Sequence, residues 1–179
     1  MLKIENTILL LIDIQGKLAH MMHEKGALFD NLQKLVKGIQ VLGVPVLWLE
    51  QNPVGLGPTI PEIADLLADA TPIGKMSFSG CRNDGFLEAL TALHRQQVLT
   101  AGIESHICVY QTTADLVAMG YAVHVVADAV SSRTAANKAI GLEKMKAAGA
   151  TLTSVETALF ELIGVAEGEA FKQILRIVK

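Results

Sequence analysis

Short runs of aliphatic and β-branched residues alternate along the chain with longer stretches of helical periodicity, and this alternation constrains the fold more than any other feature of the sequence. Because a helix between two strands returns the chain to the same end of a sheet, the pattern predicts parallel strands covered by helices. The ranges expected for strands are 7–13, 44–49, 71–75, 97–101, 121–127 and 150–154. We therefore expect a single doubly wound, Rossmann-like α/β domain over residues 1–179, with a central parallel sheet of about six strands flanked by helices.

The first strand is expected at the centre of the sheet, because residues 7–13 show no polar alternation before Asp13. Helices are expected over 28–42, near 86–93, over 105–119 and 134–148, and at the carboxyl end, with Thr59 capping a short helix near Pro61 and Ser105 capping the helix that follows it. In the helix over 134–148, we expect the apolar side chains of Ile140, Leu142 and Met145 to point inward.

The composition excludes several classes of protein. Of 179 residues, 51% are hydrophobic and 18% are charged, which is incompatible with intrinsic disorder. A net charge of −3 provides no general attraction to nucleic acid or to anionic membranes. The longest unbroken aliphatic run, residues 8–12, is far shorter than the ~20 residues of a membrane-spanning helix.

Two further features indicate a cytoplasmic protein. Glu5 and Asn6 interrupt the apolar stretch that a signal peptide would need. The only cysteines are Cys81 and Cys108, and a single bridge rarely supports a domain of this size, so we expect free thiols.

Polar residues that could carry chemistry follow the expected strands. In open parallel sheets, ligands bind beyond the carboxyl ends of the strands. The candidates at these positions are Asp13, Glu50, Lys75, Cys108 and Asp128.

Cys108 is the most informative candidate, because a cysteine in the first turn of a helix is placed where the helix dipole favours a thiolate. The alternative is a small buried hydrophobic residue. Cys81, in a polar loop, lacks that setting.

Asp13 follows four aliphatic residues, so burial would suit it to acid or base catalysis, although it could also cap the next turn. Lys75 is either its partner or a solvated loop lysine.

Three segments, LLLIDIQ, PIGKMSF and AGIESHICVYQTTADLVAMGYAVHVVADAVSSR, resemble the isochorismatase-like cysteine hydrolase family. The stretch EQNPVGLGPT looks most like the isochorismatase domain-containing proteins. The resemblance covers nearly the whole chain and implies a catalytic triad of Asp13, Lys75 and Cys108. It also implies a cis peptide bond between Ile103 and Glu104, which would turn the backbone N–H groups of Glu104 and Cys108 toward an oxyanion hole.

The activity implied is hydrolysis of a small-molecule amide or related C–N bond. Asp13, held by Lys75, would take the thiol proton while Cys108 attacks the carbonyl to form a thioester, which water then hydrolyses. The presence of Cys108 argues against the vinyl-ether cleavage of isochorismatases proper. Where nicotinamidases of this fold carry a metal-binding Asp-x-His pattern, this chain reads Glu50-Gln51-Asn52-Pro53, so neither a metal nor a cofactor is expected.

Weaker expectations concern the surroundings of the triad. Trp48 and Phe78 are candidates for the substrate pocket, with core or interface as the alternative. The Glu104 side chain would either contact the substrate or have no role of its own, because only the backbone of this residue is needed. We expect Asp128 and Arg133 to pair or to brace their loop, and His106 to point to solvent.

Alternative functions remain open at this point. A dinucleotide-binding domain is excluded, because Gly55-Leu56-Gly57 follows the second expected strand and Ile60 stands where the third small residue should be. A non-catalytic interaction module and a thiol redox sensor are the remaining alternatives.

The broad apolar helix faces of the carboxyl-terminal region predict a homo-oligomer; the residues concerned are Leu159, Phe160, Leu162 and Ile163.

Overall fold

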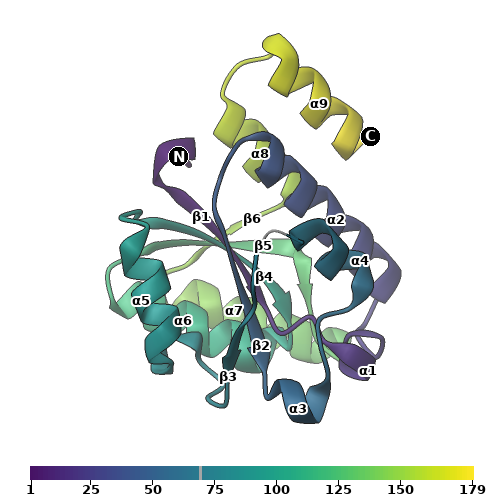
Figure 1. Cartoon of the computed structure of the whole chain (residues 1–179), viewed down its shortest axis with the longest axis vertical. Coiled ribbons are helices and arrows are strands. Elements are labelled where there is room, and N and C mark those ends of the chain that lie inside the picture. The colour runs from purple at the N-terminus through teal and green to yellow at the C-terminus, as the bar shows by residue number, and fades with distance from the viewer. Residues whose placement is uncertain (69) are drawn as a thin grey trace.

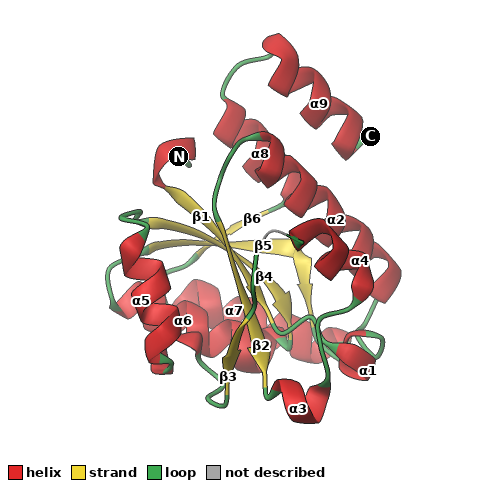
Figure 2. Ribbon diagram, in the orientation of Figure 1, coloured by secondary structure: helices red, strands yellow, loops and turns green. Residues whose placement is uncertain are grey.

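In the computed structural model, which describes residues 1–68 and 70–179, six strands form one parallel sheet in the order β3-β2-β1-β4-β5-β6 (Figure 2). The strands are β1 (Thr7–Ile12), β2 (Val46–Gln51), β3 (Ile73–Lys75), β4 (Gln97–Ile103), β5 (Ala122–Ser131) and β6 (Thr151–Thr153). The chain therefore has the single α/β architecture that the sequence predicts.

Helices cover both faces of the sheet (Figure 1). One layer contains α2 (Lys25–Val41), α4 (Pro61–Ala64), α8 (Val155–Ile163) and α9 (Gly168–Val178), and the other contains α5 (Asp84–Ala92), α6 (Tyr110–Ala118) and α7 (Ala135–Ala147). Two short helices, α1 (Gly16–Ala19) and α3 (Pro53–Leu56), lie beyond the carboxyl ends of β1 and β2. Within the described residues, no helix is both long and apolar enough to cross a membrane.

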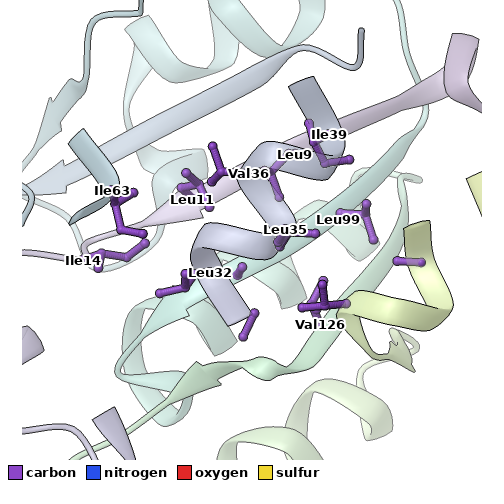
Figure 3. Close-up of a cluster of buried hydrophobic side chains, with 14 of the residues drawn as sticks. Leu9, Leu11, Ile14, Leu32, Leu35, Val36, Ile39, Ile63, Leu99 and Val126 are labelled. Carbon is purple, nitrogen blue, oxygen red and sulfur yellow. The ribbon is translucent and has the colours of Figure 1, made fainter. Parts of the chain in front are cut away.

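Strand β1 is buried along its whole length and contributes to two cores. Leu9 and Leu11 pack against α2, α4 and α8 in the cluster shown in Figure 3. Ile8, Leu10 and Ile12 point to the opposite face, toward α5, α6 and α7. Each fully buried aliphatic side chain of this kind stabilises the fold by about 1.5–3 kcal/mol. The unbroken aliphatic run is thus explained by helices on both faces.

The apolar faces of two helices differ in part from expectation. On α7, Met145 is buried and Leu142 packs against the same core, as expected, but Ile140 is 53% exposed. Leu159 and Leu162 of α8 are buried in the core, and the ring of Phe160 meets that of Phe171 of α9 edge to face. Helix α9 therefore covers much of the apolar surface on which the expectation of an oligomer was based.

Candidate active site

The strand order places a topological switch between β1 and β4. The chain runs outward from β1 through β2 to β3 and then returns to β4, on the other side of β1. Helices leave the sheet in different directions at such a point, and a crevice opens at the carboxyl ends of the two strands. Asp13 directly follows β1, and Cys108 lies five residues after β4 ends at Ile103. The fold thus brings both candidates to this crevice.

Lys75, the last residue of β3, reaches Asp13 through a buried ion pair. Its Nζ donates to Asp13 Oδ2 at 2.8 Å and to Gln51 Oε1 at 2.7 Å. The carbonyl oxygens of Ser77 and Phe78 lie 3.2 Å away. Because a buried ammonium group is costly unless it is paired and hydrogen-bonded, these acceptors compensate for the burial of Lys75 Nζ. The interpretation of Lys75 as a solvated loop lysine is wrong.

Asp13 has one carboxylate oxygen engaged and one free. Oδ1 is buried and has no hydrogen-bond partner within the described residues. Burial raises the pKa of Asp13, although the Lys75 ammonium and the neighbouring Cys108 thiol act in the opposite direction. Its backbone is in the left-handed region, with φ of 58°, which is uncommon for a residue other than glycine. An unpartnered, proton-attracting oxygen in a crevice is suited to base catalysis.

The Cys108 thiol is neutral at rest. The residue is only 6% exposed, and burial raises its pKa, with a further increase from the nearby Asp13 carboxylate, against the opposing effect of Lys75. The expected preference for a thiolate at a helix start is therefore overridden by burial and by a negative neighbour. The neutral thiol has to lose its proton for the sulfur to attack, and the neighbouring Asp13 carboxylate can accept that proton.

Cys81 provides a useful comparison within the same chain. Both cysteines are free thiols, as expected. Cys81 is partly buried, and burial, with a contribution from Asp115, raises its pKa to about 11. It lies outside the crevice that Asp13 and Cys108 share.

A π-helical turn, Ser105–Val109, carries Cys108 and continues directly into α6. The chain changes direction at Glu104, which has φ of 56° and ψ of 59°. No cis peptide bond occurs in residues 1–68 or 70–179, so the implied cis bond between Ile103 and Glu104 is a wrong expectation. A left-handed residue makes the turn instead, at a smaller conformational cost than a cis bond before a non-proline residue.

Ser105 does not cap the helix. Its hydroxyl bonds to that of Ser132 at 2.6 Å, and no side-chain cap is formed at the start of the turn. Helix α7 packs closely on the same turn, because a Cβ added at Gly141 would lie 2.5 Å from the carbonyl carbon of Ser105. Only glycine permits this approach. The turn that carries Cys108 is therefore braced by the loop after β5 and by α7.

A bulge in β4 brings its end close to β1. The pairing of β4 with β5 shifts register between Thr100 and Gly102. Gly102 has φ of 138°, and a Cβ there would lie 2.1 Å from the carbonyl oxygen of Ile12, the residue before Asp13. Bulges often redirect side chains next to active sites. This glycine sets the distance between the strand ends that carry Asp13 and Cys108.

A pocket of about 210 Å³ opens at the crevice. Asp13 and Cys108 line it, as does Phe78, which is 55% exposed. Its other lining residues are Leu18, Gln51, Leu56, Ile103, Glu104, Ile107 and Arg133. Trp48 is not among them, contrary to expectation: its side chain belongs to the hydrophobic core, where its indole N–H donates to Thr59 Oγ1 at 2.7 Å.

Glu50 is engaged in structure. Its Oε1 accepts from the backbone N–H of Thr59 at 2.7 Å and from the Thr59 hydroxyl at 2.8 Å. Thr59 therefore anchors its loop to β2 and does not cap α4. In the part of the chain that the structure describes, no three His, Cys, Asp or Glu side chains gather in a group that could hold a metal ion.

Gln15 is a positioning residue that the sequence reasoning missed. It is fully buried, and its amide nitrogen donates to the carbonyls of Gln51 and Gly57 at 3.0 and 2.7 Å. Its amide oxygen accepts from the backbone N–H of Gln51 at 2.6 Å. Gln15 thereby fixes the segment whose Gln51 side chain holds Lys75. The signal available in the sequence was the amide side chain of Gln15, two residues after Asp13 at the end of the first strand.

Glu104 is the centre of a second polar cluster. Its Oε1 accepts from Arg133 Nε at 2.9 Å, and His106 Nδ1 lies 3.4 Å from Oε2 and 3.0 Å from Ser132 Oγ. The expectation that His106 points to solvent is wrong, because its side chain is mostly buried. Asp128 and Arg133 do not pair, since Asp128 Oδ1 accepts from the backbone N–H of Val155 at the start of α8.

The fold and the site define a class of protein, the hydrolases with a cysteine in the crevice of a parallel sheet. The family model for the isochorismatase domain matches residues 7–157. The chain belongs to the isochorismatase family. It is 36% identical over 97% of its length to the secreted isochorismatase effector Isc1 of Phytophthora sojae, of which it covers 85%. It is 33% identical over 97% of its length to the isochorismatase domain-containing protein 2 of Homo sapiens, of which it covers 83%.

Solved structures show the same architecture. The structure described as MAR1 ribonuclease from Caenorhabditis elegans has a TM-score of 0.91 and 35% identity, with 99% of this chain and 91% of that chain covered. The YcaC gene product of Escherichia coli, described as an octameric hydrolase of unknown specificity, has a TM-score of 0.93 and 22% identity, with 98% and 88% covered. At that identity, the second likeness concerns the fold.

Proposed function

We propose that this hydrolase cleaves a small-molecule amide, or a related C–N bond, through a thioester on Cys108. The observation that carries the proposal is the state of Asp13. Lys75 holds one carboxylate oxygen, and the other is buried and has no hydrogen-bond partner among the described residues, in the pocket that Cys108 also lines. A neutral thiol beside an unpartnered carboxylate is arranged for proton transfer at the moment of attack.

The reaction proceeds in two halves. In the first, Asp13 accepts the thiol proton while Cys108 Sγ attacks the carbonyl carbon, and Asp13 then returns that proton to the leaving nitrogen as the C–N bond breaks. In the second, Asp13 accepts a proton from water while the water oxygen attacks the thioester carbon. The C–S bond then breaks, the acid leaves and Asp13 returns the proton to Cys108 Sγ. The backbone N–H groups of Glu104 and Cys108 remain the proposed oxyanion donors, at about 3–4 kcal/mol per donor, although the cis peptide bond expected to orient them is not formed.

Lys75 orients Asp13 and lowers its pKa against the larger effect of burial; Gln51 accepts from Lys75, and Gln15 fixes the backbone of Gln51. The residues needed for every proton transfer are therefore in the chain itself. We propose that neither a metal nor a cofactor takes part, because Glu50, at the place of the nicotinamidase metal ligand, already accepts two hydrogen bonds from Thr59.

Incubation with a panel of small amides, followed by mass spectrometry, tests the nucleophile. We expect an acyl adduct on the peptide that contains Cys108, and none after Cys108→Ala. The variant Cys81→Ala is the matched control and should form the adduct as the parent protein does. Absence of an adduct together with unchanged cysteine reactivity in Asp13→Asn would support the interaction module or the redox sensor instead.

The partners proposed are a small molecule and further copies of the chain, with no nucleic acid or membrane. Among the described residues, Glu104 pairs with Arg133 in the pocket lining, which leaves no uncompensated cation there to attract phosphate groups in a protein of net charge −3. A cytoplasmic location, which cell fractionation would test, is supported by the two free cysteines.

We propose a homo-oligomer, supported by exposed apolar side chains after β2 and β3 and by the octamer described for the YcaC fold relative. The side chains concerned are Val54, Leu56, Met76 and Phe78. Light scattering at micromolar concentration should give a mass that is a multiple of 19.1 kDa. A monomer under those conditions would contradict the proposal.

A further inference from the structure

Two ion pairs contribute charges to this pocket. Asp13 lines the pocket and pairs with the buried Lys75, and Glu104 and Arg133 both line it and pair with each other. Each pair consists of one negative and one positive charge, so the four groups sum to zero. The other lining side chains are uncharged and mostly apolar, namely Leu18, Gln51, Leu56, Phe78, Ile103, Ile107 and Cys108.

Glu104 has the geometry of a residue that faces a ligand. It is only 6% exposed, and Arg133 holds its Oε1 at 2.9 Å. Its Oε2 is buried and has no hydrogen-bond partner within the described residues, since His106 Nδ1, at 3.4 Å, is not in hydrogen-bonding geometry. A buried carboxylate oxygen without a partner is costly unless a ligand supplies a donor.

Arg133 alone would make the pocket attractive to anions. Its side chain is 49% exposed and lines the pocket, and a guanidinium is the group best suited to bind a carboxylate. Glu104 already occupies Nε and cancels the charge. An anionic substrate would then lose its hydration in a pocket that holds two carboxylates, at Asp13 and Glu104.

We propose that Glu104 sets the charge preference of this site by neutralising Arg133, so that the substrate is a small uncharged amide with an apolar acyl group and an N–H or O–H that donates to Glu104 Oε2. The proposal rests on the hydrolase function proposed above. The pocket of about 210 Å³ is smaller than the ~300–1,000 Å³ typical of sites for drug-sized ligands, which agrees with a small substrate.

Alkylation of Cys108 tests this without knowledge of the substrate. Iodoacetamide is uncharged and iodoacetate is an anion of similar size. Their rate constants at Cys108 are measured at one pH by peptide mass spectrometry, and their ratio is divided by the same ratio for N-acetylcysteine. Because ionisation of the thiol affects both reagents equally, the ratio reports the preference of the pocket. Cys81, in the same molecule, is the internal control.

In the parent protein, we expect the normalised ratio to favour iodoacetamide by about tenfold or more. Glu104→Gln, which keeps the shape and leaves Arg133 uncompensated, should lower the ratio by about tenfold, and Arg133→Gln should raise it by about threefold or more. The ratio at Cys81 should stay unchanged in both variants.

A ratio in Glu104→Gln within twofold of the parent value would overturn the inference, as would a parent ratio equal to that of N-acetylcysteine. If either of these results is obtained while amides still form an acyl adduct on Cys108, only the proposed charge preference is wrong. If Cys108 reacts with neither reagent while Cys81 is labelled, the proposed nucleophile is wrong, and this inference fails with it.

Discussion

Replacement of Lys75 by methionine is expected to lower the free energy of unfolding by about 3–5 kcal/mol. The Lys75 side chain is fully buried and donates to Asp13 and Gln51. Methionine fills a similar volume but leaves the Asp13 carboxylate buried without its counter-charge. Breaking a buried pair by removing one partner is far more destabilising than replacing both.

Urea denaturation of three variants measures this effect. Lys75→Met should be the least stable, and Lys75→Met combined with Asp13→Asn should recover part of the loss, because the uncompensated charge is then absent. Lys37→Met, on the exposed face of α2, is the matched control and should change stability by less than about 0.5 kcal/mol. A loss below about 1 kcal/mol in Lys75→Met would show that the pair is not the buried one described.

The second large effect is expected from Asp13→Asn, which should move two measurements in opposite directions. Hydrolysis of an amide that acylates the parent protein should fall by about 10²–10⁴-fold, because the base is removed. The pKa of Cys108, which burial and the Asp13 charge hold above its ordinary value, should fall as that charge disappears and Lys75 is left uncompensated. The pH dependence of iodoacetamide alkylation should therefore shift to lower pH.

Slower hydrolysis combined with a lower Cys108 pKa distinguishes a catalytic base from a purely structural residue. A residue that merely supports the fold would lower hydrolysis and leave the alkylation profile in place, or disturb both through unfolding. The control is Asp128→Asn, which keeps the Oδ1 acceptor for Val155 and removes a charge within β5, outside the pocket lining. It should leave both the rate and the profile near the parent values. An alkylation profile in Asp13→Asn that shifts to higher pH contradicts the proposed role.

Much of the fold and part of the site could be predicted from local patterns. The aliphatic run before Asp13 indicated a strand buried on both faces, and the repeated alternation indicated a parallel sheet. Because parallel strands end at the same edge, residues that follow them meet there, so their positions after strands make Asp13, Lys75 and Cys108 candidates. The structure brings Asp13 and Lys75 within 2.8 Å and places Cys108 beside them.

Other residues could not be assigned correctly, because their partners lie far away in the sequence. Trp48 lies near the end of a predicted strand, which suggests a pocket residue, but its indole N–H donates to Thr59 in the core. Glu104 pairs with Arg133, 29 residues away. Gln15 fixes a backbone segment 36 residues away. Hydrogen bonds of this kind depend on how loops meet in space, which periodicity does not report.

The sequence by itself determined the class of fold, the central strand and the strand-end positions of the reactive groups, because these follow from the spacing of apolar residues along one strand or helix. The tertiary structure alone decided the direction of the pKa shifts of Asp13 and Cys108. A helix start favours a thiolate, but burial and the Asp13 charge raise the pKa of Cys108, and Glu104 neutralises Arg133 in the pocket lining. Both effects depend on distance and desolvation, which exist only after the chain has folded.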